Sequence, residues 1–160
     1  MEEKVYETLS ALGITFERVS HPPVFTSADY AECGVPMDGT LCKNLFVRNA
    51  NKSRYYVVSL ALSKQISMKE LQEKLGESKL SFGNEQVLQE KLGVTPGSVS
   101  LLNIVNTENS DVVFVVDKEL LDSERIGFHP NVNTATVLLS PRDITAITTH
   151  YGVAYRVIRL

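Results

Sequence analysis

The most informative stretch of the chain is GTLCKNLFV at residues 39–47, an apolar, strand-like segment that carries a single lysine. Side chains alternate between the two faces of a strand, so Lys43 shares one face with Leu41 and Leu45 while Cys42 points to the other. Burying a lysine cation is costly unless it meets an anion. The pattern predicts either a cation in a pocket wall or a lysine that snorkels from an edge strand.

Around this segment, short strands and short helices alternate unevenly along the chain. Residues 41–48 and 54–62 are β-rich runs joined by the polar loop 49–53, which predicts a hairpin. Capping residues and glycine stops predict helices at 3–12, 26–34, 67–76, 84–93, 118–121 and 140–151. Further strands are expected at 14–19, 79–82, 99–105, 112–117, 134–139 and 153–158. We expect an α+β (mixed α/β) fold, a single domain over residues 1–160 with a mixed, mostly antiparallel sheet surrounded by short helices.

Composition narrows the class of protein. The 160 residues are 43% hydrophobic and 22% charged, which is ordinary for a globular domain. No apolar run approaches the roughly 20 residues that span a bilayer, and the N-terminus lacks a signal peptide's organisation. Two cysteines, Cys33 and Cys42, make a poor disulfide framework, so a cytoplasmic location is expected. Neither has metal-ligand spacing to a histidine, and we expect no metal and no cofactor.

The formal net charge of −3 argues against a broad nucleic-acid surface, which is usually basic. It leaves room for a local cationic pocket that recognises one nucleotide end. Binding of RNA there would involve few phosphate contacts and a shallow salt dependence.

Two irregular segments carry further candidate chemistry. In GFHPNVN at residues 127–133, glycine and proline bracket His129, a pattern typical of binding loops. Such a histidine could donate to a substrate carbonyl or hold a water; the alternative is a solvated turn. In LGVTPGSVS at residues 92–100, backbone N–H groups could face an anion or a carbonyl, although most such loops are only turns.

GTLCKNLFVRN at residues 39–49, together with HPPVFT at 21–26 and GFHP at 127–130, resembles the YbaK/ProX superfamily. These proteins are free-standing relatives of the editing domain inserted in bacterial prolyl-tRNA synthetases. The resemblance runs from about residue 4 to the C-terminus. It implies that Lys43 contacts the phosphate or terminal ribose at the tRNA acceptor end, with Asn44 as a polar support.

The FHPxxN pattern is similar to the alanine-editing branch, which implies that His129 sits in the aminoacyl pocket. The family's loop that encloses the aminoacyl group corresponds to the region of Gly97, although Leu101 stands where proline is common. The resemblance thus implies Lys43 and His129 as catalytic residues. It implies a substrate-binding set of Phe25, Thr26, Asn44, Gly97, Ser98, Gly127, Phe128, Pro130 and Asn133.

The implied activity is trans-editing: hydrolysis of the ester of mischarged tRNA(Pro), with alanine as the amino acid. No nucleophile–base motif is present, so water and substrate would be positioned without a covalent intermediate. The expected partners are the acceptor end of tRNA(Pro) and prolyl-tRNA synthetase, with no membrane, and the expected state is monomeric. Two alternatives stay open: a deacylase of another aminoacyl-tRNA such as Cys-tRNA, and a non-catalytic module that senses aminoacyl-tRNA or an amino acid.

Overall fold

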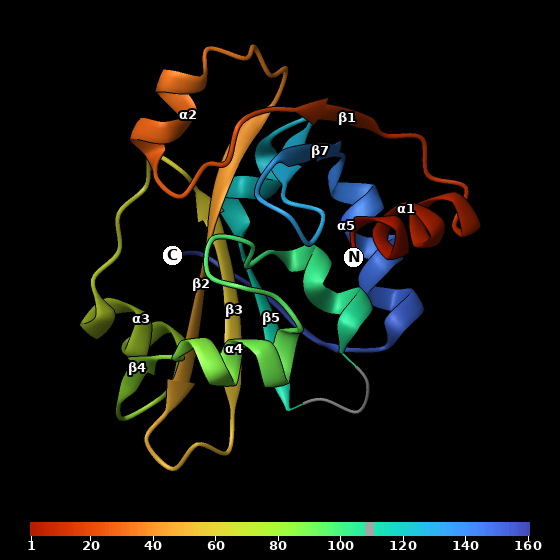
Figure 1. Ribbon diagram of the computed structural model, residues 1–160. Coiled ribbons are helices and arrows are strands. Elements are labelled where there is room, and N and C mark those ends of the chain that lie inside the picture. Colours follow the sequence, from red (N-terminus) through yellow and green to blue (C-terminus); the bar gives the residue numbers. More distant parts are fainter. Residues whose placement is uncertain (108–110) are drawn as a thin grey trace.

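The computed structural model describes residues 1–107 and 111–160, which form one mixed eight-stranded sheet with helices on both faces (Figure 1). The strand order is β1-β7-β6-β2-β3-β5-β8, and β4 also pairs with β2. Pairings β1–β7, β6–β7, β2–β3 and β2–β4 are antiparallel, and β2–β6, β3–β5 and β5–β8 are parallel. The strands are β1 (Glu17–Ser20), β2 (Thr40–Asn49), β3 (Tyr55–Ala61), β4 (Leu80–Phe82), β5 (Val112–Asp117), β6 (Ile126–Phe128), β7 (Ala135–Leu139) and β8 (Ala154–Ile158). The expected mixed, mostly antiparallel sheet is confirmed.

The helices begin and end where the capping residues predict. Side chains of Thr26, Ser67, Asn84 and Ser140 each accept a backbone N–H in the first turn of a helix. Glycines in the left-handed conformation end the same four helices. The helices are α1 (Glu2–Ala11), α2 (Ser27–Cys33), α3 (Met68–Leu75), α4 (Glu85–Leu92) and α5 (Pro141–Tyr151), with 3-10 helices η1 (Leu101–Asn106) and η2 (Lys118–Asp122).

Alternation along β2 divides the core between the two faces of the sheet. Cys42 and Phe46 pack into a cluster with residues of α1, α4, α5 and η1. Leu45 and Val47 pack on the other face, where α3 covers the sheet. The predicted alternation is therefore confirmed. In contrast, α2 has no fully buried side chain, and it stands beside the start of β2 at the periphery of the fold (Figure 1).

Two expectations about local structure are wrong. Residues 99–105 do not form a strand, because the side chains of Ser100 and Asn103 make a reciprocal capping box that starts η1. The apolar run there is fully buried, and periodicity cannot distinguish a buried strand from a buried helix. The segment expected to be irregular from Gly127 instead begins within β6. In the strand order β2 lies between β6 and β3, but at Lys43 its one ladder partner among the described strands is Leu60 of β3, because β6 pairs with residues 40–41 and β4 with residues 47–49.

Within the described ranges, no helix combines the length and the apolarity that crossing a bilayer requires.

Candidate active site

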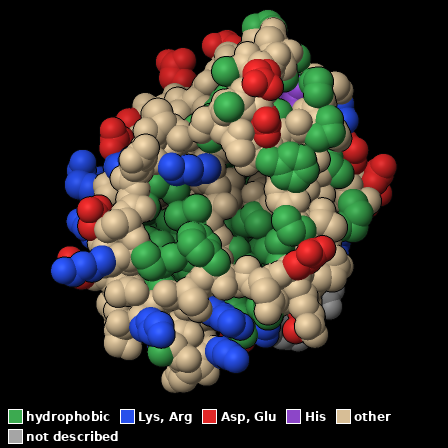
Figure 2. Space-filling view, turned by 60° about the vertical axis from the view of Figure 1, so that its left-hand side comes forward, with side chains coloured by type: hydrophobic (Ala, Val, Ile, Leu, Met, Phe, Trp, Pro, Cys, Tyr) green, Lys and Arg blue, Asp and Glu red, His purple; other side chains and the backbone are tan. Residues whose placement is uncertain are grey.

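A cavity of about 190 Å³ lies between the start of α2, strand β2 and two loops that follow α4 and β6. On the side of the molecule that carries α2 and α3, the surface is hollowed between hydrophobic side chains, with Lys and Arg near parts of the rim (Figure 2). Six predicted site residues come together in the cavity wall although they are far apart in sequence. The lining residues are Val24, Phe25, Thr26, Tyr30, Cys42, Lys43, Asn44, Leu62, Gly97, Val99 and His129.

Lys43 is the cation of this cavity. Its side chain is half-buried, and it makes no hydrogen bond or ion pair with any residue that the structure describes. By comparison, the ammonium of Lys64 lies 2.8 Å from a carboxylate oxygen of Asp117, and that of Lys91 lies 3.0 Å from one of Asp111. Lys43 therefore keeps its hydrogen-bond donors available for an anion that enters the cavity.

Asn44 and Cys42 form the neutral part of the β2 wall. The Asn44 side-chain oxygen accepts a hydrogen bond from the Ser59 hydroxyl at 2.5 Å, which fixes the orientation of the amide. The Cys42 thiol donates to the carbonyl of Gly127 at 3.1 Å, and burial raises its pKa to about 12. A thiol held neutral in this way is a poor nucleophile, so the expectation of a core cysteine is confirmed.

His129 is held at both ring nitrogens. Its Nδ1 lies 3.1 Å from the carbonyl oxygen of Gly97, and a carbonyl can only accept, so Nδ1 carries the proton. Its Nε2 lies 2.5 Å from the hydroxyl of Tyr30, which must then donate. Burial lowers the pKa of His129 to about 4, with a smaller contribution from His21. The imidazole is therefore neutral near pH 7.

The mouth of the cavity is built by Phe25, Thr26 and Asp29. The Asp29 carboxylate accepts the backbone N–H of Phe25 at 2.7 Å and that of Thr26 at 3.0 Å, and these bonds lower its pKa. The Phe25 ring is 66% exposed and lies against Gly97, where an added Cβ would come within 2.6 Å of it. Gly97 also has φ +92°, so both its backbone and its surroundings favour glycine.

Five predicted substrate-binding residues do not line the cavity. Three of them support it through the backbone or a side-chain amide: Ser98 accepts from Asn103 at 3.2 Å, Gly127 accepts from Cys42, and Asn133 donates to the carbonyl of Val24 at 3.3 Å. Phe128 and Pro130 are buried, Phe128 in the main core. A direct role of these five in binding substrate stays a prediction.

Five lining residues were not predicted as site residues from the sequence: Val24, Tyr30, Cys42, Leu62 and Val99. Of these, Tyr30 carries the most chemistry, because it holds His129. No local pattern carried a signal for it, because its contact with His129 spans 99 residues of sequence.

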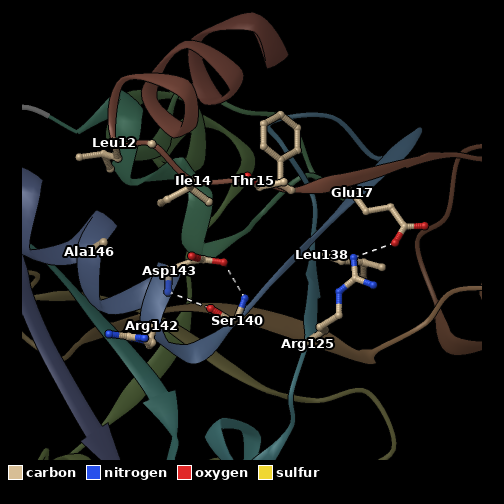
Figure 3. Close-up of a pocket in the computed structure, with 12 residues that line it drawn as sticks. Leu12, Ile14, Thr15, Glu17, Arg125, Leu138, Ser140, Arg142, Asp143 and Ala146 are labelled. Atoms are coloured by element: carbon tan, nitrogen blue, oxygen red, sulfur yellow. Dashed lines mark hydrogen bonds and ion pairs between the residues drawn. The ribbon is translucent and has the colours of Figure 1, made fainter.

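A larger groove of about 930 Å³ lies on another part of the surface, between residues 12–17 and the start of α5 (Figure 3). There Arg125 pairs with Glu17 at 2.7 Å, and Ser140 and Asp143 hydrogen-bond each other as the α5 cap. Among the described residues, no three His, Cys, Asp or Glu side chains gather as a metal site would require.

The chain is similar to known proteins over most of its length. A family model described as "Aminoacyl-tRNA editing domain" matches residues 21–147. The chain is 35% identical over 159 residues to the prolyl-tRNA editing protein ProX of Acetoanaerobium sticklandii, covering 99% of this chain and 97% of that one. It is 34% identical over 147 residues to mouse prolyl-tRNA synthetase associated domain-containing protein 1, covering 89% and 86%.

Two solved structures share the fold at low sequence identity. The hypothetical protein APE2540 has a TM-score of 0.74 at 22% identity, covering 97% of this chain and 98% of that one. A candidate trans-editing enzyme for prolyl tRNA synthetase has a TM-score of 0.73 at 16% identity, covering 99% and 96%. The family match and the identity to ProX together show that the chain belongs to the aminoacyl-tRNA editing domain family, and so to the aminoacyl-tRNA hydrolases.

Proposed function

We propose that this protein is a trans-editing deacylase that hydrolyses the ester of mischarged tRNA(Pro), with alanine as the preferred amino acid. The observation that carries the proposal is the half-buried Lys43, without a partner among the described residues, in the wall of a small cavity. The names of the relatives in bacteria and mouse, which refer to prolyl-tRNA editing and to prolyl-tRNA synthetase, support the choice of tRNA.

Lys43 would bind the phosphate or the terminal ribose of the acceptor end and so align the ester over the cavity. A water then adds to the ester carbonyl carbon, and the bond from that carbon to the ribose oxygen breaks. The ribose oxygen takes up one proton of the water and becomes a hydroxyl, the other proton is released to the solvent, and the amino acid leaves as its carboxylate. An aminoacyl ester is already activated, so alignment and charge stabilisation supply most of what the reaction needs.

The side chains of Cys42 and His129 are not suited to covalent or acid–base chemistry in the described arrangement. The Cys42 thiol is protonated, and the Nε2 of His129 already accepts from Tyr30. We assign His129 to the wall that orients the aminoacyl group, and we assign the organisation of the water to the substrate's own 2′-hydroxyl together with Lys43. Asn44 and Thr26 supply polar contacts at the mouth.

Selectivity for alanine would come from size. A synthetase pocket built for proline rejects a smaller amino acid weakly, because a missing methylene is worth only about 1–3 kcal/mol. A second, tighter cavity can admit alanine and exclude proline. Phe25 over Gly97 is the part of the wall that would close around the side chain. We further propose action as a monomer in the cytoplasm, with prolyl-tRNA synthetase as a partner.

The test is deacylation of labelled Ala-tRNA(Pro), with Pro-tRNA(Pro) and Cys-tRNA(Pro) in parallel, by wild type and Lys43→Ala. Selective, Lys43-dependent loss of alanine is the expected result, and Arg142→Ala in the larger groove serves as the matched control. Faster hydrolysis of the cysteinyl ester than of the alanyl ester would indicate that Cys-tRNA(Pro) is the preferred substrate. Binding without turnover of any ester would favour the sensing module and overturn the proposal.

A further inference from the structure

The wall of the cavity contains a hydrogen-bonded chain that joins three separate segments. The Tyr30 hydroxyl of α2 lies 2.5 Å from Nε2 of His129, and Nδ1 of His129 lies 3.1 Å from the carbonyl oxygen of Gly97. All three residues line the cavity. We propose that Tyr30 is a positioning residue that fixes the tautomer of His129 and, through it, the Gly97 wall of the site.

The direction of each bond follows from what each atom can do. The Gly97 carbonyl has no proton, so His129 must donate from Nδ1, and in the neutral ring Nε2 is then an acceptor. Only a donor satisfies Nε2, and Tyr30 supplies one. The Tyr30 and His129 rings also face each other, with centroids 6.0 Å apart and an interplanar angle of 26°.

The neighbouring His21 is held by the same logic. Its Nδ1 lies 2.9 Å from the Pro22 carbonyl, and its Nε2 lies 2.8 Å from the Thr136 hydroxyl. Its ring centroid is 6.1 Å from that of His129. Both histidines thus keep the proton on Nδ1 and have a hydroxyl at Nε2, so their ring nitrogens are already engaged before a substrate arrives.

The remaining titratable groups around His129 do not replace Tyr30. Lys43 and Cys42 line the same cavity from β2, but neither hydrogen-bonds the imidazole within the part of the chain that the structure describes. Burial raises the pKa of Tyr30 to about 12, against a smaller lowering by the hydroxyl of Thr136. Tyr30 therefore remains a protonated donor across the range in which the protein would work.

Loss of the Tyr30 hydroxyl would release two parts of the wall together. Nε2 would have no donor, so the ring could carry its proton on either nitrogen, and the bond to Gly97 would be present for only part of the time. Because Phe25 lies against Gly97, movement of that loop would also widen the mouth. The helix α2 has no fully buried side chain, and the hydrogen bond from Tyr30 to His129 is one of its contacts with the rest of the protein.

The direct experiment is long-range ¹H–¹⁵N NMR of the histidine rings in the full-length protein, which reads tautomer and protonation without substrate. Wild-type His129 is expected as a single Nδ1–H tautomer. In Tyr30→Phe we expect a mixture of tautomers and a higher His129 pKa, because a donor to Nε2 favours the neutral ring. Tyr56→Phe is the matched control, since that hydroxyl bonds Glu77 in the other core.

An Nε2–H tautomer in the wild type would overturn the inference without any variant. So would an unchanged single Nδ1–H tautomer in folded Tyr30→Phe. The kinetic readout rests on the proposed function: the preference for the alanyl over the prolyl ester should fall by about 2- to 10-fold in Tyr30→Phe, the range of one neutral hydrogen bond. If wild type hydrolyses neither ester, the proposed function fails while the NMR result still decides the role of Tyr30.

Discussion

The small cavity beside α2 and the larger groove beside α5 differ in a way that their sizes do not predict. The groove beside α5 has a volume of about 930 Å³, and the cavity beside α2 has a volume of about 190 Å³. In the larger one, Arg125 is paired with Glu17, and Asp143 caps a helix. In the smaller one, Lys43 has no such partner among the described residues. Arg142 in the larger groove is also without a partner among the described residues, but it is exposed to water, whereas Lys43 is half-buried. A half-buried charge without a partner, more than volume, distinguishes the candidate site from the surface groove.

The physical reason for this difference lies in the free energy of each site before a ligand binds. A charge that is already paired offers little to a ligand, because binding would first have to break the existing pair. A half-buried lysine without a partner is less well solvated than one in bulk water. An incoming phosphate supplies the negative charge with which this lysine can pair. Substitutions in the two sites can therefore separate function from shape.

The largest effect is expected from Lys43→Ala. Removal of one preorganised charge that stabilises a transition state typically costs about 10²–10³ in rate, so deacylation should fall by that range with the fold unchanged. Single-turnover kinetics on Ala-tRNA(Pro), with circular dichroism as the control for folding, measures it. Arg142→Ala, in the larger groove, should leave the rate within about twofold. Equal losses of rate in both variants would show that Lys43 has no special role compared with a cation in the larger groove.

The next effect concerns pH. Burial lowers the pKa of His129 from its ordinary 6.5 to about 4, so the unfolded state binds more protons than the folded state between these values. The stability from this group is complete above pH 6.5 and is lost as pH falls to 4, by on the order of 3 kcal/mol. Urea unfolding at several pH values should show it, and His129→Gln should flatten that part of the curve.

His150→Gln, on the exposed side of α5 and in a groove lined by Arg142, provides the control for replacing a histidine. Parallel curves for wild type and His129→Gln between pH 4 and 6.5 would contradict a buried, neutral imidazole in the small cavity.

Two glycines, Gly97 and Gly13, allow a further test of the role of the small cavity. Gly97 and Gly13 both have positive φ, but an added Cβ at Gly97 meets Phe25 at 2.6 Å, whereas at Gly13 nothing lies within 4 Å. A left-handed backbone costs a residue with a Cβ roughly 1–2 kcal/mol, so alanine at either position should lower the stability by about that amount. Only Gly97→Ala should also reduce deacylation, by about tenfold, because Phe25 must move. A matching loss in Gly13→Ala would assign the effect to stability alone.

Sequence patterns predicted most of the fold because its local signals are strong. The side chains of Thr26, Asn84 and Ser140 each bond a backbone N–H three residues further along the chain. The alternation along β2 likewise depends only on consecutive residues. The strand expected at 99–105 is wrong because the apolar run concealed another local signal. Ser100 and Asn103 form a capping box at this run, and the capping box starts a 3-10 helix.

The site was less predictable than the fold. Resemblance to the family brought Lys43, His129 and Gly97 into one hypothesis, and the structure places all three around one cavity. Tyr30 was missed because its role depends on a contact across 99 residues of sequence, which no local pattern contains. The protonation of His129 likewise depends on burial and on two partners that only the folded chain assembles.

The smallest effect is expected in the larger groove itself. The Arg125–Glu17 pair spans 2.7 Å, but its side chains are 33% and 52% exposed, and such surface pairs contribute about 0–1 kcal/mol. A double-mutant cycle of Arg125→Ala and Glu17→Ala by urea unfolding should give a coupling in that range, smaller in high salt. Deacylation by Arg125→Ala should match wild type. A coupling above about 2 kcal/mol would exceed the range for exposed pairs. A clear loss of activity would show that the paired groove takes part in function, and the contrast between the two cavities would then fail.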